Sequence, residues 1–96
     1  GEPVDAEEAF LMGLVSEIVE DEEVLKRAIE LANKIAKLPP ISVRQTKEVV
    51  LAGADASLEA GILLERKAFE LLFDTEDQKE GMRAFIEKRK PTFSGK

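Results

Sequence analysis

The residues best suited to chemistry lie near the end of the chain, where positive charge gathers in an otherwise acidic sequence. Lys88, Arg89 and Lys90 are consecutive, in a chain whose formal net charge is −6. Lysine binds phosphate as a point charge and arginine binds it through a fork of hydrogen bonds. Phe85 lies three residues before Lys88, a spacing that places two residues on one helix face. A flat ring beside a cation suits a nucleotide, so Phe85 and Lys88 form the candidate binding site.

The same residues also have a purely structural interpretation. Cations at a helix C-terminus offset the partial negative charge of the last carbonyl groups, an effect of about 0.3–1 kcal/mol. Phe85 shares a predicted apolar stripe with Met82 and Ile86, so it would also serve as a core residue. At this point the residues leave both interpretations open.

The rest of the composition argues against catalysis by this chain alone. His, Cys, Tyr and Trp are all absent, which removes the usual general base near neutral pH, the usual metal ligands and the thiol nucleophile. We therefore expect no metal site and no resident cofactor. The acidic balance argues against nucleic-acid binding, and no apolar run is long enough to span a membrane. A chain without cysteine or a signal peptide fits a cytoplasmic setting.

Among the acidic residues, Glu65 stands out because it falls on an apolar stripe between Ile62 and Phe69. A lone charge there is costly unless it is paired. An ion pair or a capping contact is the expected explanation, and a functional acid is the alternative. The remaining acidic pairs fall in predicted first helical turns, where the helix dipole favours them, and receive no catalytic role: Glu7-Glu8, Glu22-Glu23 and Glu76-Asp77.

About five helices are predicted to position these residues, which makes the fold class all-α, in one domain covering residues 1–96. Capping residues begin the helices, and glycine or proline ends several of them. The predicted starts are Asp5, Asp21, Ser42, Ser57 and Thr75. The predicted helices are 5–13, 21–38, 42–53, 57–73 and 75–90, with an extended connector at 14–20.

Together these helices present more apolar surface than short elements bury among themselves. Such surface indicates contact with another domain or subunit. The residues expected to be exposed in this way are Leu11, Met12, Ile18, Val19 and Leu63.

Three blocks of the sequence resemble the crotonase (enoyl-CoA hydratase/isomerase) superfamily. Residues 1–19, GEPVDAEEAFLMGLVSEIV, resemble the segment that leaves the catalytic core, with the pattern G-x-x-x-x-A-x-x-A-x-x-x-G-L-V. Residues 38–50, LPPISVRQTKEVV, are similar to the next helix start. Residues 63–93 are similar to the C-terminal signature of the enoyl-CoA hydratases, with F-x-T-x-D, E-G and A-F-x-E-K-R-x-P-x-F in that order.

The resemblance implies a part of an enzyme, namely the C-terminal helical domain without the spiral core of ββα turns. In the superfamily that core carries the oxyanion-hole amides and the catalytic glutamates, so no residue of this chain inherits a catalytic role. The helical part drives the formation of trimers, which often pair into hexamers. An aromatic residue and a lysine of the last helix help to bind the CoA nucleotide, often in a neighbouring subunit's site. The matching positions are Phe85 and Lys88.

The function implied by the resemblance is therefore oligomerisation and completion of the CoA site in an enoyl-CoA hydratase. Such an enzyme adds water to a trans-2-enoyl-CoA to give a 3-hydroxyacyl-CoA in fatty-acid or acyl-CoA metabolism. The CoA thioester would be its substrate, and the expected partners are further copies of the chain and the nucleotide portion of acyl-CoA. Isomerases, dehalogenases, hydrolases and carbon–carbon lyases share the scaffold. The alternative is a stand-alone helical module that binds a partner protein and has no CoA role.

Overall fold

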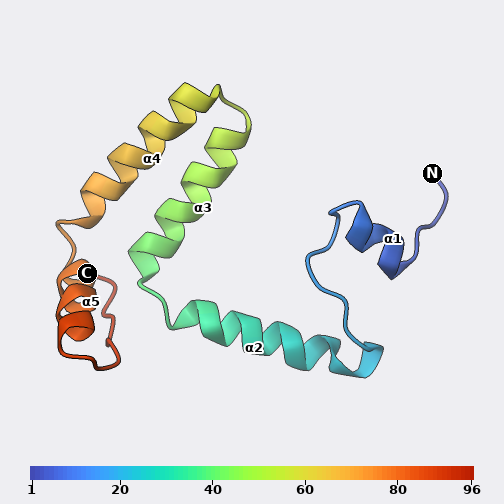
Figure 1. Cartoon of the computed structure of the whole chain (residues 1–96), viewed down its shortest axis with the longest axis horizontal. Helices are drawn as coiled ribbons and strands as arrows, with labels where there is room; N and C mark the ends of the chain where they lie inside the picture. The colour runs from blue at the N-terminus through green and yellow to red at the C-terminus, as the bar shows by residue number, and fades with distance from the viewer. The chain divides into compact units, whose positions relative to one another are not determined.

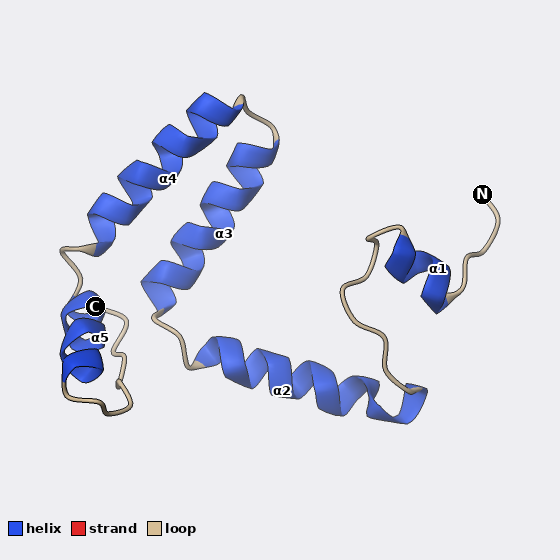
Figure 2. Cartoon of the chain, in the orientation of Figure 1, coloured by secondary structure: helices blue, strands red, loops and turns tan.

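A computed structural model describes residues 1–96 as helices joined by turns and loops, without a strand. The helices are α1 (Ala6–Leu11), α2 (Val24–Ala36), α3 (Pro40–Ala54), α4 (Leu58–Leu72) and α5 (Glu76–Ile86), and a 3-10 turn (Asp21–Glu23) leads into α2 (Figure 1). Figure 2 marks these elements by type. The all-α prediction is confirmed. No helix combines the length and the apolar character that a membrane crossing requires.

Side-chain caps begin three of the helices as the sequence predicts. The Asp5 carboxylate accepts a hydrogen bond at 2.8 Å from the backbone N–H three residues on. In the same way, the Ser57 hydroxyl accepts from Ala60 N at 3.3 Å and the Thr75 hydroxyl from Gln78 N at 3.1 Å. Each bond satisfies one of the amide groups that the first helical turn leaves without a partner.

Two predicted starts are wrong. Helix α3 begins at Pro40, two residues before Ser42, with Pro39 as its N-cap. Proline suits this first position because the helix has no acceptor for an amide there and needs a φ close to that of the proline ring. Asp21 does not cap α2; it begins the 3-10 turn, whose own N-cap is Glu20.

The chain forms two compact units, Gly1–Ala32 and Asn33–Lys96. In the first unit an exposed ion pair joins the connector to the start of α2: Arg27 Nε lies 2.6 Å from Glu17 Oε1. The hydrogen bond from Arg27 lowers the pKa of Glu17. The connector itself has no regular secondary structure.

In the second unit α3 and α4 form an antiparallel hairpin, which carries most of the helix-to-helix packing. The two helices approach closely where Gly53 faces Gly61. A Cβ atom added to Gly61 would lie only 3.6 Å from Gly53 Cα. Further along α4, Ala68 is buried, and the rings of Phe69 and Phe73 meet edge to face with centroids 5.1 Å apart. Small residues therefore set the spacing of the hairpin.

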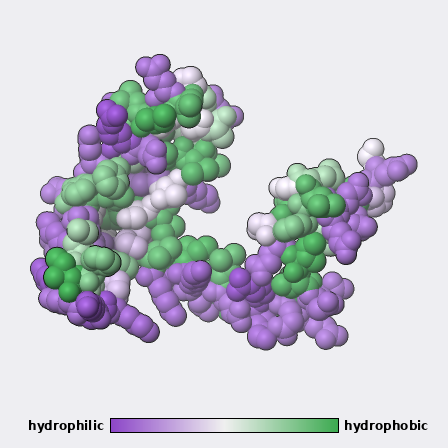
Figure 3. Space-filling view, in the orientation of Figure 1, coloured by the Kyte–Doolittle hydropathy of each residue, from purple (hydrophilic) through white to green (hydrophobic).

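The buried core is made of small side chains. The buried apolar residues are Ala9, Ala68 and Ala84, and no large side chain is fully buried. Apolar side chains lie instead on the surface of both units (Figure 3). The prediction of excess apolar surface is confirmed for Leu11, Met12, Ile18 and Leu63, which are all exposed, whereas Val19 is half-buried.

Candidate functional site

Helix α5 ends at Ile86, short of the predicted end at residue 90, because the chain reverses in a left-handed turn. Lys88 has φ of 55°. Its N–H donates to Phe85 O at 3.3 Å, and the N–H of Arg89 donates to Ala84 O at 3.0 Å. This pair of bonds is the Schellman motif, which closes a helix by satisfying its last carbonyl groups.

The turn joins the backbones of the two predicted site residues, Phe85 and Lys88. Phe85 lies in the last turn of α5 with 82% of its surface exposed. Lys88 is exposed at the left-handed position, and its backbone is bonded to that of Phe85. Lys88 therefore follows the end of α5 in a turn and does not continue the helix face that carries Phe85. In this chain Phe85 is a surface residue, so the core interpretation of its ring does not hold here.

Arg89 has a different environment from the two lysines beside it. Its Nη1 and Nη2 atoms lie 2.6 and 2.8 Å from the two carboxylate oxygens of Glu80, and its Nε lies 2.6 Å from Glu87 Oε2. Lys88 and Lys90 form no ion pair within the chain. Both lysines are exposed and lie just beyond the C-cap Glu87 of α5.

Glu80 is the centre of this ion-pair network. Besides the fork from Arg89, its Oε1 atom accepts a hydrogen bond from Thr92 N at 2.9 Å. The hydrogen bonds from Arg89, and next the one from Thr92, lower the pKa of Glu80 to about 2. The bond with Glu80 raises the pKa of Arg89 in turn. Glu80 thus remains charged at any physiological pH and holds the returning chain against α5.

A second carboxylate, Asp77, holds the rest of the C-terminal segment. Asp77 is buried, with 3% of its surface exposed. It accepts from Ser94 N at 2.6 Å, from the Ser94 hydroxyl at 3.3 Å and from Gly95 N at 2.9 Å, while its own N–H donates to Lys96 O at 3.2 Å. The prediction that helix-start electrostatics fully explains Glu76-Asp77 is wrong for Asp77, because its carboxylate binds the chain terminus.

These contacts give physical content to the C-terminal signature. The signature contains the helix cap Thr75, the two anchoring carboxylates Asp77 and Glu80, and the anchored Arg89. Gly81, beside Glu80, leaves room for the ring of Phe93, since an added Cβ atom would lie 3.7 Å from Phe93 Cε1. The motif was thus the sequence signal that pointed to these residues, but it did not reveal that they bind one another.

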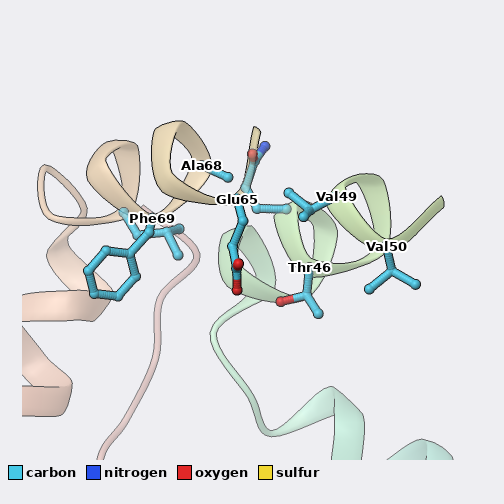
Figure 4. A pocket seen from close by; sticks show the side chains of 8 residues that line it. Thr46, Val49, Val50, Glu65, Ala68 and Phe69 are labelled. Carbon is cyan, nitrogen blue, oxygen red and sulfur yellow. The ribbon is translucent and has the colours of Figure 1, made fainter. Parts of the chain in front are cut away.

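A small pocket between α3 and α4 contains Glu65, the other acidic residue singled out by the sequence. The pocket has a volume of about 180 Å³. Glu65 reaches from α4 toward Thr46 of α3, with Val49 and Ala68 nearby (Figure 4). The expected ion pair or capping contact of Glu65 is not formed within the chain. No group of three or more acidic side chains lies close enough to hold a metal ion.

Comparison with known proteins gives consistent matches over the whole chain. Residues 1–96 match the family described as Enoyl-CoA hydratase/isomerase. The chain is 46% identical over 95 residues to (E)-benzylidenesuccinyl-CoA hydratase of Thauera aromatica, covering 99% of this chain and 37% of that protein. It is 38% identical over 96 residues to 2,3-dehydroadipyl-CoA hydratase of Escherichia coli, covering 100% of this chain and 38% of that protein.

Solved structures agree with the sequence matches. A crystal structure of an enoyl-CoA hydratase/isomerase from Mycobacterium paratuberculosis superposes with a TM-score of 0.93 at 38% identity, covering 99% of this chain and 37% of that one. The enoyl-CoA hydratase of Bacillus anthracis gives a TM-score of 0.90 at 41% identity, with 95% and 35% coverage. The chain therefore spans little more than a third of the length of the relatives it matches.

Proposed function

Because the chain belongs to the enoyl-CoA hydratase/isomerase family, we propose that it is the C-terminal helical part of an enoyl-CoA hydratase and completes that enzyme's CoA site. The complete enzyme adds water to a trans-2-enoyl-CoA and yields a 3-hydroxyacyl-CoA. The groups that activate water and hold the thioester enolate belong to the part of the enzyme outside this chain. This chain supplies contacts to the CoA nucleotide and is inactive alone.

The observation that supports the proposal is that an exposed ring and a lysine without an ion-pair partner lie within one turn at the end of α5. Phe85 is 82% exposed, and Lys88, whose N–H donates to Phe85 O, has no ion-pair partner. The ring offers a flat apolar surface to the adenine base, and the ammonium group offers a point charge to a phosphate. The relatives' names specify different acyl groups, benzylidenesuccinyl and 2,3-dehydroadipyl, but the same CoA carrier. A site for the nucleotide serves each of these substrates alike.

The substitution Lys88→Ala in the complete enzyme tests the proposal. We expect the Kd for CoA to rise at least about tenfold, since a hydrogen bond to a charged group contributes roughly 1.5–3 kcal/mol. The Kd for CoA lacking its 3′-phosphate should change little. Isothermal titration calorimetry with the two ligands measures both values.

The matched control is Lys90→Ala, which removes the same charge two residues away. It should leave the ratio of the two dissociation constants close to that of the unmodified enzyme. Equal losses for both ligands in Lys88→Ala, or the same change in ratio for Lys90→Ala, would contradict a phosphate contact at Lys88.

We further propose that the apolar faces of the helices contact other copies of the protein, as trimers or pairs of trimers, in a cytoplasmic enzyme. One such face is a groove of about 480 Å³ on α3 and the residues before it, lined by Ile35, Leu38, Val43, Val50 and Leu51. The same exposed surface also suits the alternative, a helical module that binds another protein. That module would need neither Phe85 nor Lys88 for its function, so the CoA measurements separate the two.

A further inference from the structure

We infer that Glu80 and Arg89 are positioning residues for the CoA contact, because their forked ion pair holds the turn that carries Lys88. The inference rests on the proposed function, since it concerns how Lys88 is held and not whether Lys88 binds phosphate. Neither Glu80 nor Arg89 touches the ligand in this arrangement.

The contacts of Glu80 close a loop around Lys88. After α5 ends, the chain passes through Lys88, and the side chain of Arg89 then folds back to bind both carboxylate oxygens of Glu80 at 2.6 and 2.8 Å. Thr92 N donates to Glu80 Oε1 at 2.9 Å. One carboxylate on α5 therefore anchors the chain at two points beyond Lys88.

The backbone of Lys88 needs support from the rest of the turn. Its φ of 55° lies in the left-handed region, which residues other than glycine rarely occupy unless their surroundings stabilise it. The two backbone bonds of the turn and the Arg89 fork supply that support. Without the fork, the turn would exchange with other conformations in which Lys88 points elsewhere. The apparent affinity for the ligand falls in proportion to the fraction of molecules that retain the competent conformation.

Glu80 and Asp77 hold different parts of the C-terminal segment. Asp77 binds the segment at Ser94 and Gly95, and a Cβ atom on Gly95 would lie 3.4 Å from the side chain of Pro40 at the start of α3. Asp77 thus ties the last residues of the chain to the start of α5. The Glu80 fork closes only the short turn around Lys88, so its loss should affect that turn first.

Arg89→Lys in the complete enzyme is the sharpest test. The substitution keeps the positive charge near the phosphate but removes the fork, because lysine has one ammonium group instead of a planar guanidinium. We expect the ratio of the dissociation constants for 3′-dephospho-CoA and CoA to fall about threefold. KM for the enoyl-CoA should rise while kcat stays unchanged, because the reacting groups lie elsewhere. The matched control is Arg83→Lys, the same change on α5 at an arginine without an ion pair.

A double-mutant cycle completes the test. If Arg89 acts through Lys88, then Arg89→Lys in a Lys88→Ala background should cause no further fall in the ratio of the dissociation constants for 3′-dephospho-CoA and CoA. Glu80→Gln, which removes the other half of the fork, should reproduce the effect of Arg89→Lys, and circular dichroism should show retained helix in each variant.

The two proposals fail in different ways. If Lys88→Ala leaves the ratio unchanged, the CoA role of Lys88 is wrong. If Lys88→Ala lowers the ratio but Arg89→Lys and Glu80→Gln do not, only the positioning role is overturned. Additive losses in the double variant, or equal losses for both ligands, would also overturn it, as would a collapse of helix content in both fork variants.

Discussion

Lys88 adopts a left-handed backbone conformation that allows the two hydrogen bonds of the turn but is sterically unfavourable for a residue with a side chain. The position after a helix end that takes positive φ is usually glycine, and a side chain there is disfavoured by about 1–2 kcal/mol. The presence of a lysine at φ of 55° is therefore not explained by stability alone. The proposed ligand contact of its ammonium group would supply a reason for it.

Because Lys88 has positive φ, we predict that Lys88→Gly has opposite effects on stability and on CoA binding. The free energy of unfolding should rise by about 1 kcal/mol, because glycine adopts the left-handed conformation without steric conflict. Selectivity for CoA over 3′-dephospho-CoA should be lost as in Lys88→Ala. Thermal unfolding and calorimetry on the same variant measure the two effects.

Lys90→Gly provides the control for that substitution. Lys90 does not have positive φ, so glycine there should lower the melting temperature or leave it unchanged. A lower melting temperature for Lys88→Gly would contradict the assignment of strain to Lys88.

At the scale of the element, α5 and the segment that follows it behave as one folded piece. Two carboxylates three residues apart on α5, Asp77 and Glu80, bind the returning chain at Thr92, Ser94 and Gly95. Ala84, on the same face, is 1% exposed, and its carbonyl accepts the N–H of Arg89. The apolar residues on other faces of α5 remain open.

The Glu80 anchor predicts a specific acid sensitivity of this piece. The pKa of Glu80 in the folded chain is about 2, below the ordinary value of 4.5. The anchor is therefore fully formed above about pH 4.5 and is lost as the pH falls through 2. A carboxyl NMR titration of the chain should give Glu80 a midpoint near 2, and Arg89→Leu should move that midpoint back toward 4.5.

An internal control accompanies this titration. The pKa of Glu17 is also lowered, but by Arg27 in the first unit, so Arg89→Leu should not move it. An unchanged Glu80 midpoint in Arg89→Leu would show that Arg89 is not the main cause of the shift.

At the scale of the whole molecule, the dominant feature is the mismatch between a small buried core and a large apolar surface. Leu58 is 81% exposed and Leu51 is 61% exposed, and the buried apolar residues are all alanines. Large exposed apolar surfaces are typical of proteins that contact other proteins, and this surface is the basis of the proposed self-association.

We therefore predict that the isolated chain self-associates as its concentration rises. Leu51→Glu, in the groove on α3, should weaken association, because it places a charge in an apolar contact. Gln78→Glu adds the same charge outside the groove and should have little effect. Light scattering across a concentration series measures the mass of each variant. A chain that stays monomeric throughout would contradict self-association through these helices.

Local chemistry determined much of the fold directly from the sequence. Asp5, Ser57 and Thr75 each accept a bond from an amide three residues on, so nothing distant is needed to place those helix starts. Pro40 misled the prediction because a proline pair can both end one helix and begin the next. Which of the two roles a proline pair takes depends on the tertiary packing around it, and the sequence alone does not give that packing.

The candidate site divides in the same way. The types of Phe85 and Lys88, and their match to a family signature, came from the sequence. Their exposure, the left-handed turn and the pairing of Arg89 with Glu80 came only from the tertiary structure. The reason is that the chain reversal occurs at a lysine, where the usual glycine signal is absent, and that the bonds to Glu80 come from Arg89 and Thr92, which lie nine and twelve positions further along the chain. Side chains at such separations meet only after the chain has folded.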